Sequence, residues 1–166
     1  MTLIQVQDEL KGFNIREGGI SISNQPSDLA NKEPPLRLAI IVPYRDRKTN
    51  LHLFLLYMHQ FLTRQNVFYG IYLVEPEKNL KFNRAMLINI GYIESLKQTE
   101  YNWNCFVFHD VDLLPESEKN VYGCDKNFPK QMAIAVNINS YSYVQFFYIL
   151  NSFRKLLIEI FNLIKC

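Results

Sequence analysis

The sequence predicts an α/β fold with a mostly parallel sheet. Short apolar segments rich in β-branched and aromatic residues alternate with longer segments whose apolar residues recur at helical spacing. The order strand, helix, strand, helix, strand is typical of parallel strands joined by right-handed crossovers. The composition agrees, because 48% of the 166 residues are hydrophobic and 20% are charged, as in a globular domain with a buried core.

The expected strands are short and apolar. They follow an irregular lead-in, residues 1–35, which holds paired glycines and prolines and shows little periodicity. Residues 36–42 (Leu-Arg-Leu-Ala-Ile-Ile-Val), closed by Pro43, predict a first buried strand. The alternating, aromatic residues 67–74 predict a second, and residues 105–109 (Cys-Phe-Val-Phe-His) predict a third.

The expected helices carry apolar stripes. In residues 51–64 and again in residues 82–97, apolar side chains recur every three or four positions. Residues 132–136 predict a fourth strand after these elements. The residues from 146 to 165 fit a further, amphipathic helix.

The composition argues against two classes of function. A net charge of +2, without basic clusters interleaved with aromatics, does not favour nucleic-acid binding. The most apolar stretch, residues 143–164, is interrupted by Arg154, Lys155 and Glu159, so it falls short of the roughly 18 apolar residues that a membrane span needs. The N-terminus also lacks the features of a signal peptide. We therefore expect neither nucleic acid nor a membrane as a direct partner.

Two carboxylates follow the third predicted strand. Asp110 and Asp112 are separated by one residue, and residues i and i+2 of an extended segment point to one side. They therefore emerge together at the edge of the sheet where ligands of open parallel sheets bind. A divalent cation relieves the repulsion between them, and an all-oxygen site suits Mg²⁺ or Mn²⁺. The alternative is a solvated acidic turn.

Basic residues lie at the ends of the other elements. Arg45 and Arg47 flank Asp46 after the first strand, where their guanidinium groups suit phosphate oxygens. Tyr44 offers a ring on which a base can stack. The alternative for this turn is a solvated loop with an internal Arg–Asp pair.

The second helix begins with a misplaced charge. Asn83 is expected to cap this helix, and Arg84 next to it is disfavoured by the helix dipole. A ligand, or an acidic partner such as Asp112, would offset that cost. His109, before the first carboxylate, is a candidate ligand or base; the alternative is a histidine that is hydrogen-bonded at the end of a buried strand.

The three cysteines leave two interpretations open. Cys105 and Cys124 flank a segment of loop length and can form a disulfide, which would leave Cys166 over. The alternative is three reduced thiols in a cytosolic protein.

Three segments of the chain are more specific together than each is alone. Residues 40–47 (Ile-Ile-Val-Pro-Tyr-Arg-Asp-Arg), 82–92 (Phe-Asn-Arg-Ala-Met-Leu-Ile-Asn-Ile-Gly-Tyr) and 105–115 (Cys-Phe-Val-Phe-His-Asp-Val-Asp-Leu-Leu-Pro) occur in this order, and the match continues to Cys124. They resemble the β-1,4-galactosyltransferase family and its invertebrate N-acetylgalactosaminyl relatives. The resemblance covers residues 36–147.

The resemblance implies a fold, an activity and a compartment. The fold would be the Rossmann-like glycosyltransferase-A fold, which binds nucleotide sugars. The activity would be Mn²⁺-dependent, inverting transfer of galactose or N-acetylgalactosamine from UDP-galactose or UDP-N-acetylgalactosamine to a terminal N-acetylglucosamine or glucose of a glycoprotein or glycolipid. The family acts in the Golgi lumen, held by a membrane anchor that this chain does not contain. The alternative is a catalytically inactive half-domain that binds UDP or a partner protein.

The resemblance also assigns residues. Asp112 would be a metal ligand, with Asp110 close behind it, and Cys105 and Cys124 fall where the family has a disulfide, which implies a secretory compartment. The residues that would hold the UDP-sugar are Pro43, Tyr44, Arg45, Asp46, Arg47, Phe82, Asn83, Arg84, Val111 and Asp112.

The sequence departs from the family after residue 147. Tyr148 and Ile149 stand where the family has a Gly-Gly turn, and Ile138 stands where a lysine is expected. The family's segment with the catalytic carboxylate and the acceptor contacts is not found, nor is the histidine that completes the metal site, so no catalytic residue is named. We therefore expect a donor-binding domain at residues 36–147 and a divergent amphipathic tail at residues 148–166.

Overall fold

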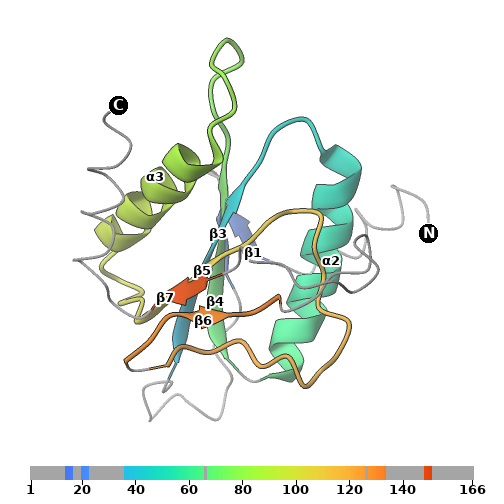
Figure 1. Cartoon of the computed structure of the whole chain (residues 1–166), viewed down its shortest axis with the longest axis vertical. Coiled ribbons are helices and arrows are strands. Elements are labelled where there is room, and N and C mark those ends of the chain that lie inside the picture. Colours follow the sequence, from blue (N-terminus) through green and yellow to red (C-terminus); the bar gives the residue numbers. More distant parts are fainter. Residues whose placement is uncertain are drawn as a thin grey trace.

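A mixed sheet in the order β1-β2-β4-β3-β5-β7-β6 forms the centre of the molecule (Figure 1). The computed structural model describes residues 14–16, 20–22, 36–65, 67–125, 127–133 and 148–150. Two helices flank the sheet in this part of the chain, α2 (Lys48–Arg64) and α3 (Arg84–Lys97). The strands are β1 (Asn14–Arg16), β2 (Ile20–Ile22), β3 (Arg37–Pro43), β4 (Phe68–Val74), β5 (Cys105–Phe108), β6 (Lys130–Gln131) and β7 (Tyr148–Leu150).

The three central strands are parallel, as predicted. β3 lies between β4 and β5 and pairs with both in parallel register, so that Pro43 lies beside Val74 and Ile41 beside Phe108. The carboxyl ends of the three strands therefore meet at one edge of the sheet. The predicted α/β class with its parallel core is confirmed.

Alternate side chains of β3 are buried on opposite faces of the sheet. Leu38 and Ile40 are fully buried in the cluster that contains Phe54 and Met58 of α2. Ala39, between them, is buried in the opposite cluster, with residues of α3. Because successive side chains of a strand point to opposite faces, the helices cover opposite faces of the sheet, as Figure 1 shows.

Helix α3 packs very close to the sheet at Gly91. A Cβ atom added there would lie 2.4 Å from Ile41 Cγ2 and 2.6 Å from Val74 Cγ2, which is far inside van der Waals contact. Gly91 therefore allows the short distance between α3 and the strands β3 and β4. That distance in turn places the first residues of α3 above the edge of the sheet.

The outer strands differ from the sequence predictions. β2 pairs with β4 and β7 pairs with β5, both antiparallel. β1 and β2 form a short hairpin within residues 1–35, where no regular structure was predicted. Strands of three residues leave too little alternation to be recognised from sequence.

Two predicted elements near the C-terminus fare differently. The strand expected at 132–136 is wrong for residues 132–133, which follow the two-residue strand β6 and belong to no strand, and residues 134–136 lie outside the described part of the chain. The helix expected at 146–165 is wrong for residues 148–150, which form strand β7. The rest of that tail also lies outside the described residues. None of the described helices has the length and apolar character needed to cross a membrane.

Candidate functional site

A cavity of about 540 Å³ opens at the edge of the sheet where β3, β4 and β5 end. It is formed by the loops that follow these strands and by the first turn of α3. Its lining residues are Pro43, Arg45, Asp46, Arg47, Phe82, Arg84, Asp110, Val111 and Asp112. The structure thus brings together, from three separated segments, most of the residues for which the resemblance implied contact with a nucleotide sugar.

Two of the predicted residues do not line the cavity. Tyr44 packs against the core on the α2 side, and its backbone N–H donates to the carbonyl of Val74 at 2.9 Å. Burial, and then the Glu75 carboxylate, raises the pKa of its phenol. Asn83 caps α3, where its Oδ1 accepts from the backbone N–H of Met86 at 3.1 Å. Tyr44 thus anchors the loop after β3 by its backbone bond and core packing, and Asn83 anchors the start of α3 by its side chain.

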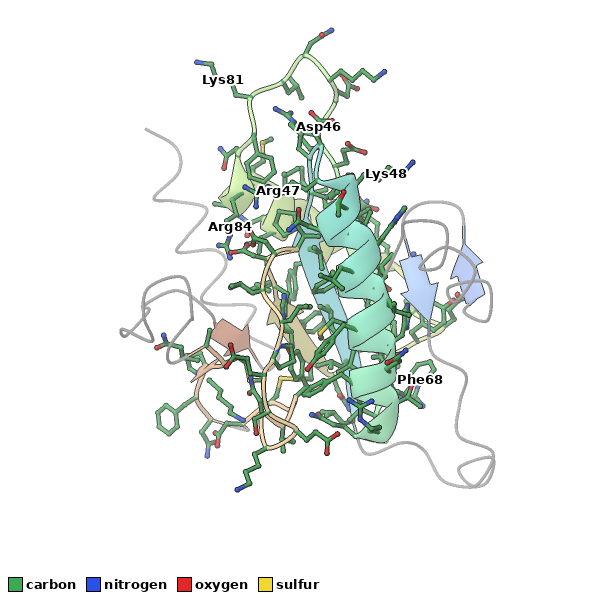
Figure 2. The ribbon with its side chains drawn as sticks, turned by 90° about the vertical axis from the view of Figure 1, so that its right-hand side faces the viewer. Asp46, Arg47, Lys48, Phe68, Lys81 and Arg84 are labelled. Carbon is green, nitrogen blue, oxygen red and sulfur yellow. A yellow bond between two sulfur atoms is a disulfide. The ribbon has the colours of Figure 1, made fainter. Side chains whose placement is uncertain are left out.

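Two ion pairs join the loop after β5 to other segments that line the cavity. Arg47, from the loop after β3, pairs with Asp112, and Arg84 Nε lies 2.7 Å from Asp110 Oδ1. The predicted acidic partner of Arg84 was Asp112, and this detail was wrong. Arg47 bonds to Asp112 in the loop after β5 instead of pairing with its neighbour Asp46, so the internal Arg–Asp pair considered for this turn is not found for Arg47. Figure 2 shows Arg47 and Arg84 on the same side of the molecule.

These ion pairs are weak enough to be exchanged. The side chains of Arg47 and Asp112 are 56% and 41% exposed, and pairs so exposed contribute only about 0–1 kcal/mol. A diphosphate carries more negative charge than one carboxylate and offers more acceptor oxygens for the planar guanidinium group. The site can therefore give up both pairs for a phosphate ligand at small cost.

Arg45 makes a different set of contacts. Its Nη2 lies 2.5 Å from the carbonyl oxygen of Leu80 and 3.4 Å from that of Glu77. Its guanidinium carbon lies 5.8 Å from the ring centre of Phe82, within the range of a cation–π contact. Arg45 thus faces the loop between β4 and α3 and makes no ion pair with the aspartates after β5.

Asp46 has an unusual backbone conformation. Its φ of 51° lies in the left-handed region, which aspartate tolerates better than most residues. This conformation turns the chain sharply between Arg45 and Arg47, so their side chains leave in different directions. Asp46 itself is exposed at the rim of the cavity.

His109 lies behind the cavity and outside its lining. Its ring is buried and bonds to the carbonyl oxygen of Asp110 and to the hydroxyl of Tyr122, both at 2.8 Å. Burial lowers its pKa, so the ring is neutral, with Nδ1–H donating to the carbonyl and Nε2 accepting from Tyr122. His109 is therefore the hydrogen-bonded histidine at the end of a buried strand that was considered as the alternative to a ligand or base. Sequence reasoning missed Tyr122, because no local pattern indicates which aromatic residue returns to a strand end.

A disulfide fastens the same loop. Cys105, at the start of β5, is bonded to Cys124, with their Cα atoms 5.7 Å apart. The pairing implied by the resemblance is confirmed. Residues 109–112, which carry both carboxylates, are therefore held at one end by β5 and at the other by the disulfide-bonded return of the chain.

The cavity offers donor groups that fit a hard divalent cation. Among the residues that the structure describes, no three His, Cys, Asp or Glu side chains gather as a metal site. The carboxylate oxygens of Asp110 and Asp112 are nevertheless the ligand type that Mn²⁺ and Mg²⁺ prefer. Asp112 is the more exposed of the two, and together with phosphate oxygens it can contribute to an all-oxygen site.

Comparison with known proteins gives consistent relatives. A family model described as the N-terminal region of glycosyl transferase group 7 matches residues 2–125. Human β-1,4-galactosyltransferase 4 is 48% identical over 105 residues, which are 63% of this chain and 30% of that protein. Human β-1,4-galactosyltransferase 3 is 48% identical over 120 residues, 71% of this chain and 30% of that protein. The chain thus spans about 30% of the length of these curated relatives.

Two solved structures share the fold. One is a mutant of Drosophila β-1,4-galactosyltransferase 7 in complex with manganese, UDP-Gal and xylobiose, with a TM-score of 0.60 and 29% identity over 70% of this chain and 49% of that one. The other is the catalytic domain of the same enzyme with xylobiose, with a TM-score of 0.58 and 28% identity. Both have the glycosyltransferase-A fold, which confirms the fold class predicted from the resemblance.

Proposed function

We propose that this chain, which belongs to the β-1,4-galactosyltransferase family within glycosyl transferase group 7, binds the UDP part of a sugar donor in the cavity at the strand ends. The proposal rests on two ion pairs within one cavity, Arg47 with Asp112 and Arg84 with Asp110, whose carboxylates can be replaced by phosphate oxygens. A site that is neutral when empty and holds two mobile guanidinium groups suits a doubly charged diphosphate.

Different lining residues would contact different parts of the UDP. Arg47 and Arg84 would turn from the carboxylates to the diphosphate oxygens. The ring of Phe82, which is 46% exposed, offers an apolar surface for the uracil. The backbone of Pro43, Asp46 and Val111 would close the remaining sides, because these residues also line the cavity.

A divalent cation has a place in this arrangement. Asp112, freed from Arg47, would be the protein ligand of Mn²⁺, and Asp110, freed from Arg84, would lie beside it. When bound, the cation supplies positive charge that neutralises the diphosphate leaving group. The support is the donor chemistry of Asp112 and the manganese and UDP-Gal named for the Drosophila relative.

The reaction that we propose is transfer of galactose, or of N-acetylgalactosamine, to a terminal N-acetylglucosamine or glucose of a glycoprotein or glycolipid, with inversion. The names of the human relatives support galactosyl transfer. The compartment that we propose is the Golgi lumen, because the Cys105–Cys124 disulfide requires an oxidising environment. The domain that binds the donor would comprise residues 36–147, flanked by the lead-in 1–35 and the tail 148–166.

The test is UDP binding by calorimetry, with and without Mn²⁺, on the oxidised chain. We expect binding that Mn²⁺ strengthens and that Arg47→Met weakens by about tenfold or more, since a charged hydrogen bond is worth about 1.5–3 kcal/mol. Arg64→Met is the matched control, because Arg64 pairs with Glu118 outside the cavity. A folded chain that binds no UDP, or in which Arg47→Met binds as tightly as Arg64→Met, would contradict the proposal.

A transfer assay separates the enzyme from its alternative. Release of UDP that depends on a glycan acceptor ending in N-acetylglucosamine would support transfer. UDP binding with no turnover on such acceptors would favour the half-domain that only binds UDP or a partner.

A further inference from the structure

We infer that Arg45 is a positioning residue: it holds the β4–α3 loop, residues 75–83, as one wall of the cavity and acts on the nucleoside through Phe82. This inference rests on the proposed function for the identity of the ligand. It departs from the sequence expectation, in which both arginines of the Arg45-Asp46-Arg47 turn bound phosphate.

The contacts of Arg45 all lie on this loop. Its guanidinium group donates to the carbonyl oxygens of Leu80 and Glu77 and covers the ring of Phe82. Arg47, two residues later, bonds across the cavity to Asp112. Because Asp46 between them has a positive φ, the turn directs one arginine to each wall.

The loop that Arg45 holds is long and extends beyond the core. Figure 2 shows Lys81 at the far end of the molecule, beyond Asp46, and Figure 1 shows the same segment as a projection between β4 and α3. Leu80 is 50% exposed. The loop has its own turn, with the N–H of Leu80 donating to the carbonyl of Glu77 at 3.0 Å. Arg45 is the side chain that joins this turn to the loop after β3.

The backbone brings the two loops side by side before Arg45 fastens them. The N–H of Tyr44 donates to the carbonyl of Val74, which continues the β3–β4 pairing to the last residue before Arg45. At the other end of the loop, Asn83 caps α3. Arg45 therefore supplies the middle of three attachments, next to Phe82.

The chemistry of these contacts favours a positioning role. A guanidinium group bonded to two carbonyl oxygens has fewer donors to offer a phosphate, and its planar face is already placed over an aromatic ring. Phe82 lines the cavity and keeps nearly half of its surface exposed. A base that stacks on Phe82 would meet a ring whose position depends on Arg45.

The experiment compares Arg45→Met with Arg47→Met in the full oxidised chain. The first measurement is hydrogen exchange of the backbone amides of residues 77–82 without ligand. We expect Arg45→Met to accelerate exchange in this segment by about tenfold and Arg47→Met to change it by less than about twofold, because Arg45 bonds to this loop and Arg47 bonds to Asp112 instead. An unchanged exchange rate in Arg45→Met would overturn the inference.

The second measurement is the affinity for uridine and for UDP. Arg45→Met is expected to weaken both by the same factor, because it disturbs the wall against which the base lies, whereas Arg47→Met weakens UDP alone. UDP binding that falls in Arg45→Met while uridine binding is retained would show direct phosphate contact and would overturn the inference. If the native chain binds neither ligand, the proposed function fails, and the exchange rates alone decide the role of Arg45.

A second variant protects the test against a general loss of structure. Phe82→Leu removes the ring and keeps an apolar side chain. If Arg45 acts through Phe82, adding Arg45→Met to Phe82→Leu should weaken uridine binding by much less than it does in the native chain, because the two effects are coupled. Fully additive losses would contradict the inference.

Discussion

Asp110 and Asp112 are two residues apart and line one cavity, yet one bonds to an arginine at the start of α3 and the other to an arginine in the loop after β3. The sequence was sufficient to place both carboxylates at the strand end. It could not assign their partners, because the direction in which Arg84 leaves the start of α3 depends on how the helix packs on the sheet. Long-range packing of this kind leaves no mark in the local pattern.

The two carboxylates are expected to differ in their effect on metal binding. Asp112→Asn should reduce the strengthening of UDP binding by Mn²⁺ by about tenfold or more, because it removes the oxygen ligand that we assign to the cation. Calorimetry with and without Mn²⁺ measures this effect, and Glu118→Gln, an exposed carboxylate outside the cavity, is the control. Full retention of the Mn²⁺ effect in Asp112→Asn would rule out Asp112 as a ligand.

His59 is expected to make stability depend on pH. Its buried ring bonds to the hydroxyl of Tyr69 at 2.7 Å, and burial lowers its pKa to about 4. The unfolded chain, with a histidine pKa of about 6.5, therefore binds more protons between pH 6.5 and pH 4, and acid favours unfolding. The loss of stability through this window reaches roughly 3 kcal/mol at its lower end.

The measurement for His59 is urea unfolding at several pH values, compared with His59→Gln. Glutamine keeps a hydrogen-bonding side chain and does not titrate, so its stability should fall less steeply between pH 6.5 and pH 4. Parallel curves for the two proteins would show that His59 does not carry the effect. Other acid-sensitive groups are common to both proteins and cancel in the comparison.

At the scale of elements, the contact between α3 and the sheet decides where the site lies. Gly91→Ala should destabilise the fold by roughly 1–3 kcal/mol, because the new methyl group would clash with the buried side chain of Ile41 and the partly buried side chain of Val74. Alanine favours helix over glycine by about 1 kcal/mol, which offsets only part of this cost. Thermal or urea unfolding measures the net effect.

The control for Gly91 is another glycine. At Gly123 an added Cβ would meet only Leu36 Cδ2, at 3.8 Å, so Gly123→Ala should change stability by no more than about 0.5 kcal/mol. If the two substitutions have equal effects, the close approach of α3 is not the cause. A loss of UDP affinity in Gly91→Ala alone would further link the position of α3 to that of Arg84.

The elements also show what the sequence could predict. Strands β3 and β4 and both helices span seven or more residues with a regular apolar pattern, and β5 is a short but strongly apolar strand. The sequence therefore predicted the type of each of these elements correctly. The antiparallel strands β2 and β7 have three residues each, and they form because neighbouring strands offer unpaired backbone groups. Residues 148–150 have a helical pattern in the sequence, but pairing with β5 makes them a strand.

At the scale of the whole molecule, the disulfide is expected to contribute strongly to stability. Cys105 and Cys124 close a loop with a sequence separation of 19, and cross-links around loops of this size restrict the unfolded chain by about 3 kcal/mol. The double variant Cys105→Ala, Cys124→Ala should lose about that much in urea unfolding. Native protein treated with reductant should lose a similar amount, and the variant should not respond to reductant.

The same variant separates stability from binding. The loop with Asp110 and Asp112 is also held by the bonds of His109 to Asp110 and Tyr122. At a temperature where the variant is still folded, we therefore expect UDP affinity to fall by less than about tenfold. A complete loss of binding by folded variant would show that the disulfide alone places the carboxylates.

The opposite placement of the two helices has one more consequence. The chain leaves β3 over one face of the sheet and returns, by way of β4, over the other, to place β5 on the far side of β3. The winding direction reverses between β3 and β5, and the loops after these two strands must part there. The chain order thus decides at which point along the sheet edge the cavity lies, and the lining side chains then shape its walls. Because the topology sets the place of this cavity, proteins that share the fold can bind different ligands at the same edge of the sheet.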